Sequence, residues 1–153
     1  MSAMEKGTAN IRRMGRGDVN AVLAIDRKIS GGRGLITYED MVAAAPGGAL
    51  DLSFVAEIDG QVAGFILARI TYVGVPFIEI AVIQALVVDP DYQRRGIATR
   101  LVHALLDYCH TEEVRVNTIR VALDERNIRL RRFFERLGFR RSELIGYTRT
   151  FES

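Results

Sequence analysis

Between residues 86 and 99 the chain reads LVVDPDYQRRGIAT. This pattern predicts the end of a buried strand, a turn through Asp89-Pro90, a loop around Gly96 and the start of a helix. Free N–H groups at a helix start carry partial positive charge, and a glycine lets the backbone approach a ligand without a Cβ in the way. Ala98 keeps a second point of approach small, and the Thr99 hydroxyl can donate a hydrogen bond. We therefore expect an anion site that suits a polyphosphate better than a single carboxylate.

The same stretch excludes two common phosphate motifs. No Gly-Lys-Ser/Thr follows the loop, as it does in a nucleotide P-loop. A dinucleotide fingerprint needs three glycines and an acidic residue at the end of the following strand, whereas this loop has only Gly96. The predicted ligand is therefore a different kind of polyphosphate.

The residues just before this stretch predict the centre of a sheet. The apolar, β-branched run from Phe77 to Val88 is typical of a strand buried on both faces. Asp59-Gly60 predicts a two-residue hairpin turn between strands at 53–58 and 61–68, because both central residues of such a turn take positive φ.

The first third of the chain predicts one strand and two helices. The strand is expected at residues 11–14, and Asp18 is expected to cap the helix that follows. Thr37 is expected to cap a second short helix that ends near Ala45.

Downstream of the loop, helices and strands alternate. The pattern predicts an amphipathic helix over 99–112, a strand over 114–123 and a helix over 127–137 that Gly138 ends. One or two final strands are expected over 139–151. This order of elements predicts a mixed α/β sheet rather than a doubly wound one.

Composition sets the broad class of the protein. The 153 residues, 48% hydrophobic and 26% charged, predict one folded domain over residues 1–153. A formal net charge of +2 argues against a nucleic-acid partner. The single Cys109 excludes an internal disulfide, and with only two histidines no metal site is expected. No run approaches the roughly 18 apolar residues of a membrane span, and residues 1–16 lack a signal-peptide core, so we expect a cytoplasmic protein that does not bind membranes.

Two blocks of the sequence resemble the GNAT superfamily of N-acyltransferases. Gln93–Ala98, QRRGIA, matches its Q/R-x-x-G-x-G/A signature, and Asn127–Phe139 is similar to its N-x-x-A-x-x-F-Y-E-K-L-G-F block. The resemblance extends from Ile11 to Phe151, and it implies a central mixed, mostly antiparallel sheet with helices on both faces.

The resemblance also implies a reaction. A GNAT protein moves an acetyl or other short acyl group from acyl-CoA to a primary amine, by direct transfer in a ternary complex and without a metal. The donor would be acetyl-CoA, and the acceptor a small-molecule amine or a protein or peptide amine. A homodimer is possible, as in many relatives. The residues that the resemblance assigns to cofactor binding are Leu86, Val87, Val88, Gln93, Arg94, Arg95, Gly96, Ile97, Ala98, Thr99, Asn127 and Phe134.

The sequence departs from the family where the chemistry usually lies. Phe134 stands where many members have a tyrosine that protonates the leaving thiolate, and Leu130 replaces an alanine. The usual positions of a side-chain base are occupied by Val82, Gln84 and Ala122, none of which can act as a base.

Three residues remain as candidates for the chemistry. Glu79 lies on the long strand, although odd numbering puts it opposite Val82 and Gln84 unless a bulge intervenes. Tyr147 falls in the expected C-terminal strands, where some relatives place a substrate or acid residue. We therefore take Glu79 and Tyr147 as the catalytic candidates and Gln84 as a substrate-binding candidate.

Two other functions compete with an active transferase. The vacant base positions and Phe134 favour a degenerate member that binds acyl-CoA as a regulatory module without turnover. An arginine-rich nucleic-acid module is the third hypothesis, against which the small net charge argues. The sequence does not identify the acceptor.

Overall fold

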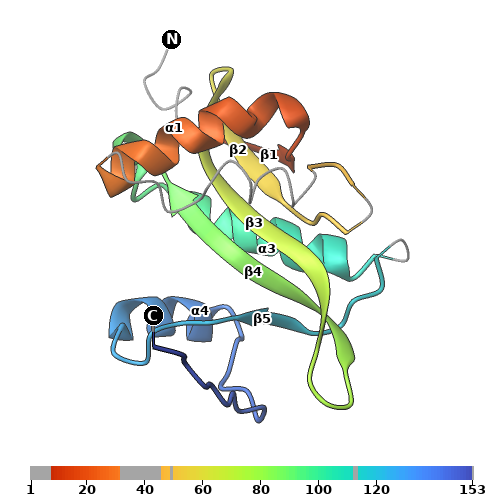
Figure 1. Ribbon diagram of the computed structural model, residues 1–153. Helices are drawn as coiled ribbons and strands as arrows, with labels where there is room; N and C mark the ends of the chain where they lie inside the picture. The colour runs from red at the N-terminus through yellow and green to blue at the C-terminus, as the bar shows by residue number, and fades with distance from the viewer. Residues whose placement is uncertain (1–7, 32–45, 49, 112–113, 153) are drawn as a thin grey trace.

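The protein folds around one five-stranded sheet with the strand order β1-β2-β3-β4-β5 (Figure 1). A computed structural model describes residues 8–31, 46–48, 50–111 and 114–152. Neighbouring strands are antiparallel except β4 and β5, which are parallel. The elements are β1 (Asn10–Arg13), η2 (Arg16–Asp18), α1 (Val19–Ser30), β2 (Phe54–Ile58), β3 (Gln61–Val73), β4 (Ile78–Val88), η3 (Pro90–Tyr92), α3 (Ile97–Cys109), β5 (Ile119–Val121) and α4 (Ile128–Arg136).

Helices cover both faces of the sheet, so the expected fold class is confirmed (Figure 1). We call the two sides the α1 face and the α3 face. On the α1 face, Phe65 and Leu67 of β3 pack with Val22 and Ile25 of α1. The larger core lies on the α3 face, and its buried members include Ile66, Ala68, Ala81, Ile83, Leu101, Leu105 and Phe134. Alternate residues of β2, β3 and β4 therefore enter different cores, as the two-residue period of a strand requires.

Two turn predictions are confirmed by backbone geometry. Asp59 and Gly60 have φ of 52° and 79°, the positive values that a two-residue hairpin needs. Gly138, with φ of 91°, follows α4 in the left-handed conformation that ends many helices. The predicted central strand 77–88 is β4, almost to the residue.

The prediction that Asp18 caps α1 with its side chain is wrong. The Asp18 carboxylate instead accepts hydrogen bonds from the Arg12 guanidinium at 2.8 and 2.9 Å and from the Gly15 N–H at 2.8 Å. These bonds hold the pKa of Asp18 below its usual value, with Arg12 as the main cause. An ion pair with a neighbouring strand outcompetes the local cap, because it also satisfies a half-buried arginine.

The predicted C-terminal strands are also not found. Within residues 139–152 the structure has no strand, and the expected strand over 114–123 is reduced to β5. Tyr147 and Phe151 are 91% and 74% exposed. Alternating apolar residues form a strand only where a neighbouring strand pairs with them, and here a hollow separates this segment from the outer edge of β5. The helix expected to start at Thr37 lies outside the described residues.

Candidate active site

The decisive feature is a separation of two parallel strands. β4 and β5 pair only from Ala81 to Ile83, while β4 continues to Val88 and the chain after Val121 turns toward α4. From Gln84 onward, the edge of β4 that faces β5 therefore has no strand beside it. An unpaired strand edge presents N–H and C=O groups that an extended ligand can pair with.

This open edge leads directly into the predicted anion loop. Gly96 is the N-cap of α3 with φ of 73°, and Arg94 also has a positive φ, 66°. The first helical bond runs from the Arg100 N–H to the Gly96 carbonyl at 3.1 Å. The N–H groups of residues 97–99 therefore precede the helical ladder, at the positive end of the helix dipole. Backbone N–H groups in such left-handed turns form concave anion sites.

The loop leaves room for a ligand. A Cβ built on Gly96 would meet no atom within 4 Å, so the space in front of this glycine is open. Gln93, Arg94 and Arg95 are exposed, as is Gly96 itself. Ile97 is only 3% exposed and packs in the core, so it offers the ligand its backbone and not its side chain.

The start of the loop is fastened to α1 by an ion pair. The Lys28 ammonium donates to Asp89 at 2.9 Å and to Asp91 at 2.7 Å, and Asp89 also accepts the Asp91 N–H at 2.9 Å. The two aspartates raise the pKa of Lys28 to about 12. Burial raises the pKa of Asp89, but the Asp91 N–H and Lys28 outweigh it, so the net shift is downward. No sequence signal identified Lys28, because its partners lie about sixty residues away.

Close packing fixes the end of β4. The Asp89 N–H donates to the Ala63 carbonyl at 2.8 Å, and a Cβ on Gly64 would lie 3.0 Å from the Val87 carbonyl. Only a residue without a side chain lets β3 approach so closely. Leu86, Val87 and Val88, which the resemblance assigns to cofactor binding, are half-buried along this stretch.

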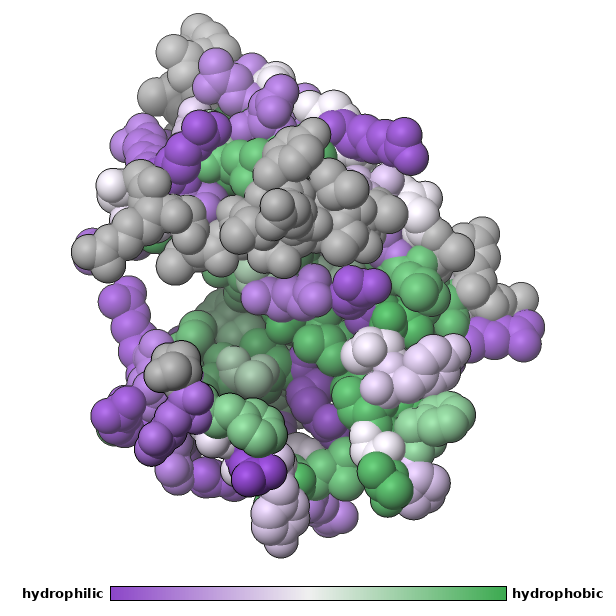
Figure 2. All heavy atoms as spheres, viewed as in Figure 1, coloured by the Kyte–Doolittle hydropathy of each residue, from purple (hydrophilic) through white to green (hydrophobic). Residues whose placement is uncertain are grey.

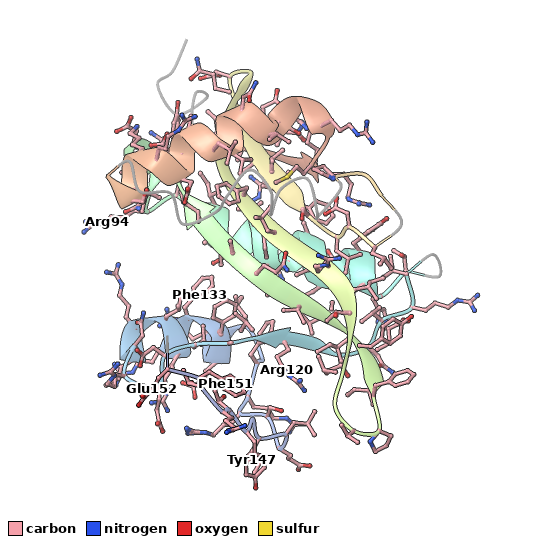
Figure 3. All side chains as sticks on the ribbon, viewed as in Figure 1. Arg94, Arg120, Phe133, Tyr147, Phe151 and Glu152 are labelled. Atoms are coloured by element: carbon pink, nitrogen blue, oxygen red, sulfur yellow. The ribbon has the colours of Figure 1, made fainter. Side chains whose placement is uncertain are left out.

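The helix α4 lies across from the unpaired edge of β4 (Figure 1), and we call the region between them the opening. The Asn127 side chain accepts the Leu130 N–H at 3.1 Å and so caps this helix. Phe134 is 3% exposed and makes edge-to-face contacts with Phe133 and Phe139, with centroids 5.0 and 5.2 Å away. Figure 3 shows Arg94 of the loop and Phe133 of α4 on the two sides of the opening. Asn127 and Phe134, which were predicted to bind the cofactor, therefore both have a structural role: Asn127 caps α4, and Phe134 packs in the core.

A β-bulge places Gln84 where the strands separate. Leu67 pairs with Ala85 but Ala68 pairs with Ile83, so Gln84 is an extra residue in β4. A bulge re-aims side chains, and beyond it the odd residues of β4 face α1. Gln84 is exposed at this point, and Val82 precedes it on the α1 face. The sequence did not predict where a bulge would lie; a bulge was named only as the condition under which Glu79 would share a face with Gln84.

The structure does not bring Glu79 to this point. Glu79 precedes the bulge and pairs with Tyr72, so it lies on the α3 face, opposite Val82. It is five residues from Gln84, or about 17 Å along a strand. Its carboxylate is the main cause of the raised pKa of Tyr72.

Tyr147 also lies apart from the opening. Its side chain is 91% exposed, and Figure 3 shows it at the tip of the C-terminal segment, pointing away from the sheet. A hollow of about 1070 Å³ separates this segment from β5 and α4, and its lining includes Arg120 and Phe134. Figure 2 shows an apolar floor within the recess between the upper and lower parts of the molecule.

Comparison with known proteins identifies the family. A model of the acetyltransferase (GNAT) family matches residues 29–139, more than half of the chain. The chain belongs to this family. The match includes both the Gly96 loop and the α4 block, so the resemblance found in the sequence is confirmed.

Other GNAT proteins share parts of the sequence and the whole fold. An uncharacterised N-acetyltransferase of Methanocaldococcus jannaschii is 29% identical over 93 residues, which cover 60% of this chain and 40% of that protein. This chain thus spans about two fifths of the relative's length. The aminoglycoside acetyltransferase AAC(6')-Iy, solved with a bisubstrate analogue, superposes with a TM-score of 0.75 at 19% identity over 94% of this chain and 99% of its own. A ribosomal-protein alanine N-acetyltransferase from Escherichia coli gives 0.68 at 24% identity, covering 88% and 79%.

Within the described residues, no group of three or more His, Cys, Asp or Glu side chains could hold a metal ion. No helix in the described part of the chain has both the length and the apolar content to cross a bilayer.

Proposed function

We propose that this GNAT protein is an acetyl-CoA-dependent N-acyltransferase that moves an acetyl or other short acyl group to a primary amine. The observation that carries the proposal is the continuity of three features: the unpaired edge of β4 from Gln84, the Gly96 loop and the N-terminus of α3. A ligand with an extended amide-bearing arm and a diphosphate has the chemistry of all three.

The residues present fit acyl-CoA. The N–H groups of residues 97–99 and the side chains of Arg94 and Arg95 would receive the diphosphate, since guanidinium and helix N-termini both favour phosphate oxygens. The backbone of residues 86–88 would pair with the amides of the arm, as an added strand does. The Gln93 amide donates to the Val88 carbonyl at 3.4 Å, a weak bond that the arm would replace.

The acyl carbon would then lie near the bulge, and the amine would approach from the α1 face. The amine nitrogen attacks the thioester carbonyl, the carbon–sulfur bond breaks, and the amine proton passes to water or to the departing thiolate. Backbone N–H groups of the β4 edge would polarise the carbonyl oxygen. Orientation of the two reactants supplies part of the acceleration, because it replaces a bimolecular encounter.

The described residues at the bulge favour an amine of low pKa. Val82, Gln84 and Ala122 occupy the usual base positions, and none of them can remove a proton. An α-amine, with a pKa near 8, is far more often neutral at pH 7 to 8 than a lysine ε-amine near 10.4. The names of two structural neighbours, an aminoglycoside and a ribosomal-protein alanine acetyltransferase, support amines as the acceptor class.

The second candidate is a GNAT module that binds acyl-CoA without turnover. Phe134 favours it, because a phenyl ring cannot donate a proton to the leaving thiolate and here it is buried among aromatic rings. An assay of CoA thiol release over a panel of amines separates the two functions. Turnover of any amine above the hydrolysis rate supports the transferase, whereas acetyl-CoA binding with no turnover of any amine supports the binding module.

A further inference from the structure

We propose that the acceptor of this enzyme is a small amine that also carries a carboxylate, and that Arg69 and Arg120 bind this carboxylate. The inference rests on the proposed function, because it concerns the acceptor side of the same site. It names a class of substrate and the two residues that select it.

The two arginines lie in one row across three strands. Arg69 of β3 pairs with Val82 of β4, and Val82 pairs with Arg120 of β5. Directly paired residues share a face of a sheet, so both arginines lie on the same face as Val82, the α1 face. With neighbouring strands about 4.8 Å apart, the two Cα atoms are separated by roughly 10 Å. Two long side chains at that separation can reach one anion above Val82.

Neither arginine side chain has a polar partner in the described part of the protein. Arg12, Arg13 and Arg100 all bond to carboxylates or carbonyls of the protein. By contrast, within the part of the chain that the structure describes, the side chain of neither Arg69 nor Arg120 makes a hydrogen bond, ion pair or ring contact. Both are half-buried, so their charges are partly removed from water without a protein partner.

The acidic residue that pairs with Arg69 does not neutralise it. Asp51 forms a backbone bridge with Arg69, but its buried carboxylate accepts the N–H groups of Gly47 and Ser53 and lies 3.5 Å from the Arg13 guanidinium. Arg120 lines the large hollow beside β5, and Figure 3 shows its side chain extending from β5. The row therefore presents two available guanidinium groups around an apolar residue.

The position of the row fits an amino-acid-like acceptor. Val82 lies two residues before Gln84, so the row is about 7 Å along the strand from the place where the acyl carbon would lie. An amine at the bulge and a carboxylate over Val82 would belong to one compact molecule. A planar guanidinium fork matches a planar carboxylate, which is the strongest pairing that arginine makes.

The test uses acceptors in matched pairs and variants of Arg120. Each pair has one amine skeleton with either a carboxylate or a carboxamide, such as alanine and alaninamide or lysine and lysinamide. We expect Arg120→Gln to lower kcat/KM for the carboxylate member by roughly tenfold to a hundredfold, through KM, and to change the carboxamide value less than threefold. Comparing the variant's effect within a pair cancels the different pKa values of the two amines. Arg69→Gln should have the same selective effect, and Arg120→Lys should restore part of the loss.

The control is a variant at another arginine, and the second measurement is the Tm in the presence of acetylated products. Arg16→Gln removes the same charge from an exposed site in η2, before α1, and should change the value for neither member of a pair. With CoA present, N-acetyl-alanine should raise the Tm of the wild type more than N-acetyl-alaninamide does, and Arg120→Gln should abolish the difference.

Four results would overturn the inference. They are an equal effect of Arg120→Gln on both members, a preference for a phosphate-bearing amine, turnover of neutral amines only, and no stabilisation by the carboxylate product. Every variant should still bind acetyl-CoA. If the wild type itself does not bind acetyl-CoA, the proposed function is refuted instead.

Discussion

At the scale of the residue, Gly96 decides whether the loop can hold a diphosphate. Its open surroundings mean that a side chain there would meet the ligand and not the protein. We predict that Gly96→Asp abolishes acetyl-CoA binding by calorimetry while the fold survives, because an aspartate tolerates positive φ and its charge repels phosphate. Gly60→Asp is the matched control, since Gly60 has φ of 79° in a hairpin turn away from the loop. Unchanged affinity in Gly96→Asp would remove this loop from the site.

Lys28 is the residue that holds the loop to α1, and its role has a pH signature. Its pKa is raised to about 12, so its contribution to stability is complete below the unfolded pKa near 10.4 and is lost only as the pH rises through 12. The lowered pKa of Asp89 means that this partner is lost only as the pH falls below the unfolded value near 3.9.

The corresponding prediction compares Lys28→Met with the wild type. We expect a small decrease in Tm and a few-fold weaker acetyl-CoA binding in Lys28→Met, because exposed ion pairs contribute little stability but this one positions the loop. Between pH 6 and pH 9 the Tm difference should be constant. Lys28→Arg should retain wild-type affinity. A Tm difference that varies with pH across that range would mean that another group titrates at this contact.

At the scale of the element, α3 joins the anion loop at one end to the core at the other. Cys109 in its last turn is 1% exposed, and burial raises the pKa of its thiol to about 11. The thiol therefore stays protonated at neutral pH, where a thiol is unreactive. We predict no reaction with an aromatic disulfide reagent at pH 8 in the native protein and one equivalent after unfolding. Rapid native labelling would show that the end of α3 opens readily.

The helix α4 is fixed mainly by its aromatic residues. Phe134 is buried between Phe133 and Phe139, so Phe134→Ala should leave a cavity and reduce the free energy of unfolding by about 3–5 kcal/mol. Chemical denaturation measures this loss, with the exposed Ile128→Ala on the same helix as the control. A loss below about 1 kcal/mol would mean that α4 is not anchored by this ring.

The elements show what the sequence could predict. The Asp59-Gly60 turn, β4 and the loop before α3 depend on local patterns, and all three were found. The bulge at Gln84 was not located, because it arises from the pairing of β3 with β4 and leaves no local mark. The cap by Asp18 and the C-terminal strands were wrong because tertiary contacts decided them: Arg12 of β1 binds the Asp18 carboxylate, and a hollow separates the C-terminal segment from β5.

At the scale of the whole molecule, the sheet explains why the cofactor side of the candidate site could be predicted from the sequence and the acceptor side could not. The cofactor side is a single continuous stretch from β4 to α3, which a motif can describe. The acceptor side is assembled across strands, where Arg69, Val82 and Arg120 come together only through the register of three strands. Residues separated by so many positions give no sequence pattern, so the acceptor row could be found only in the fold.

The central claim is that the open edge of β4 and the Gly96 loop bind acyl-CoA. The most direct measurement is thermal unfolding of the wild type with and without excess acetyl-CoA. At about one hundred times its dissociation constant a ligand adds about 2.7 kcal/mol, which for a domain near this size corresponds to a rise in Tm of several degrees. We predict that rise. No change in Tm at millimolar acetyl-CoA would contradict the claim.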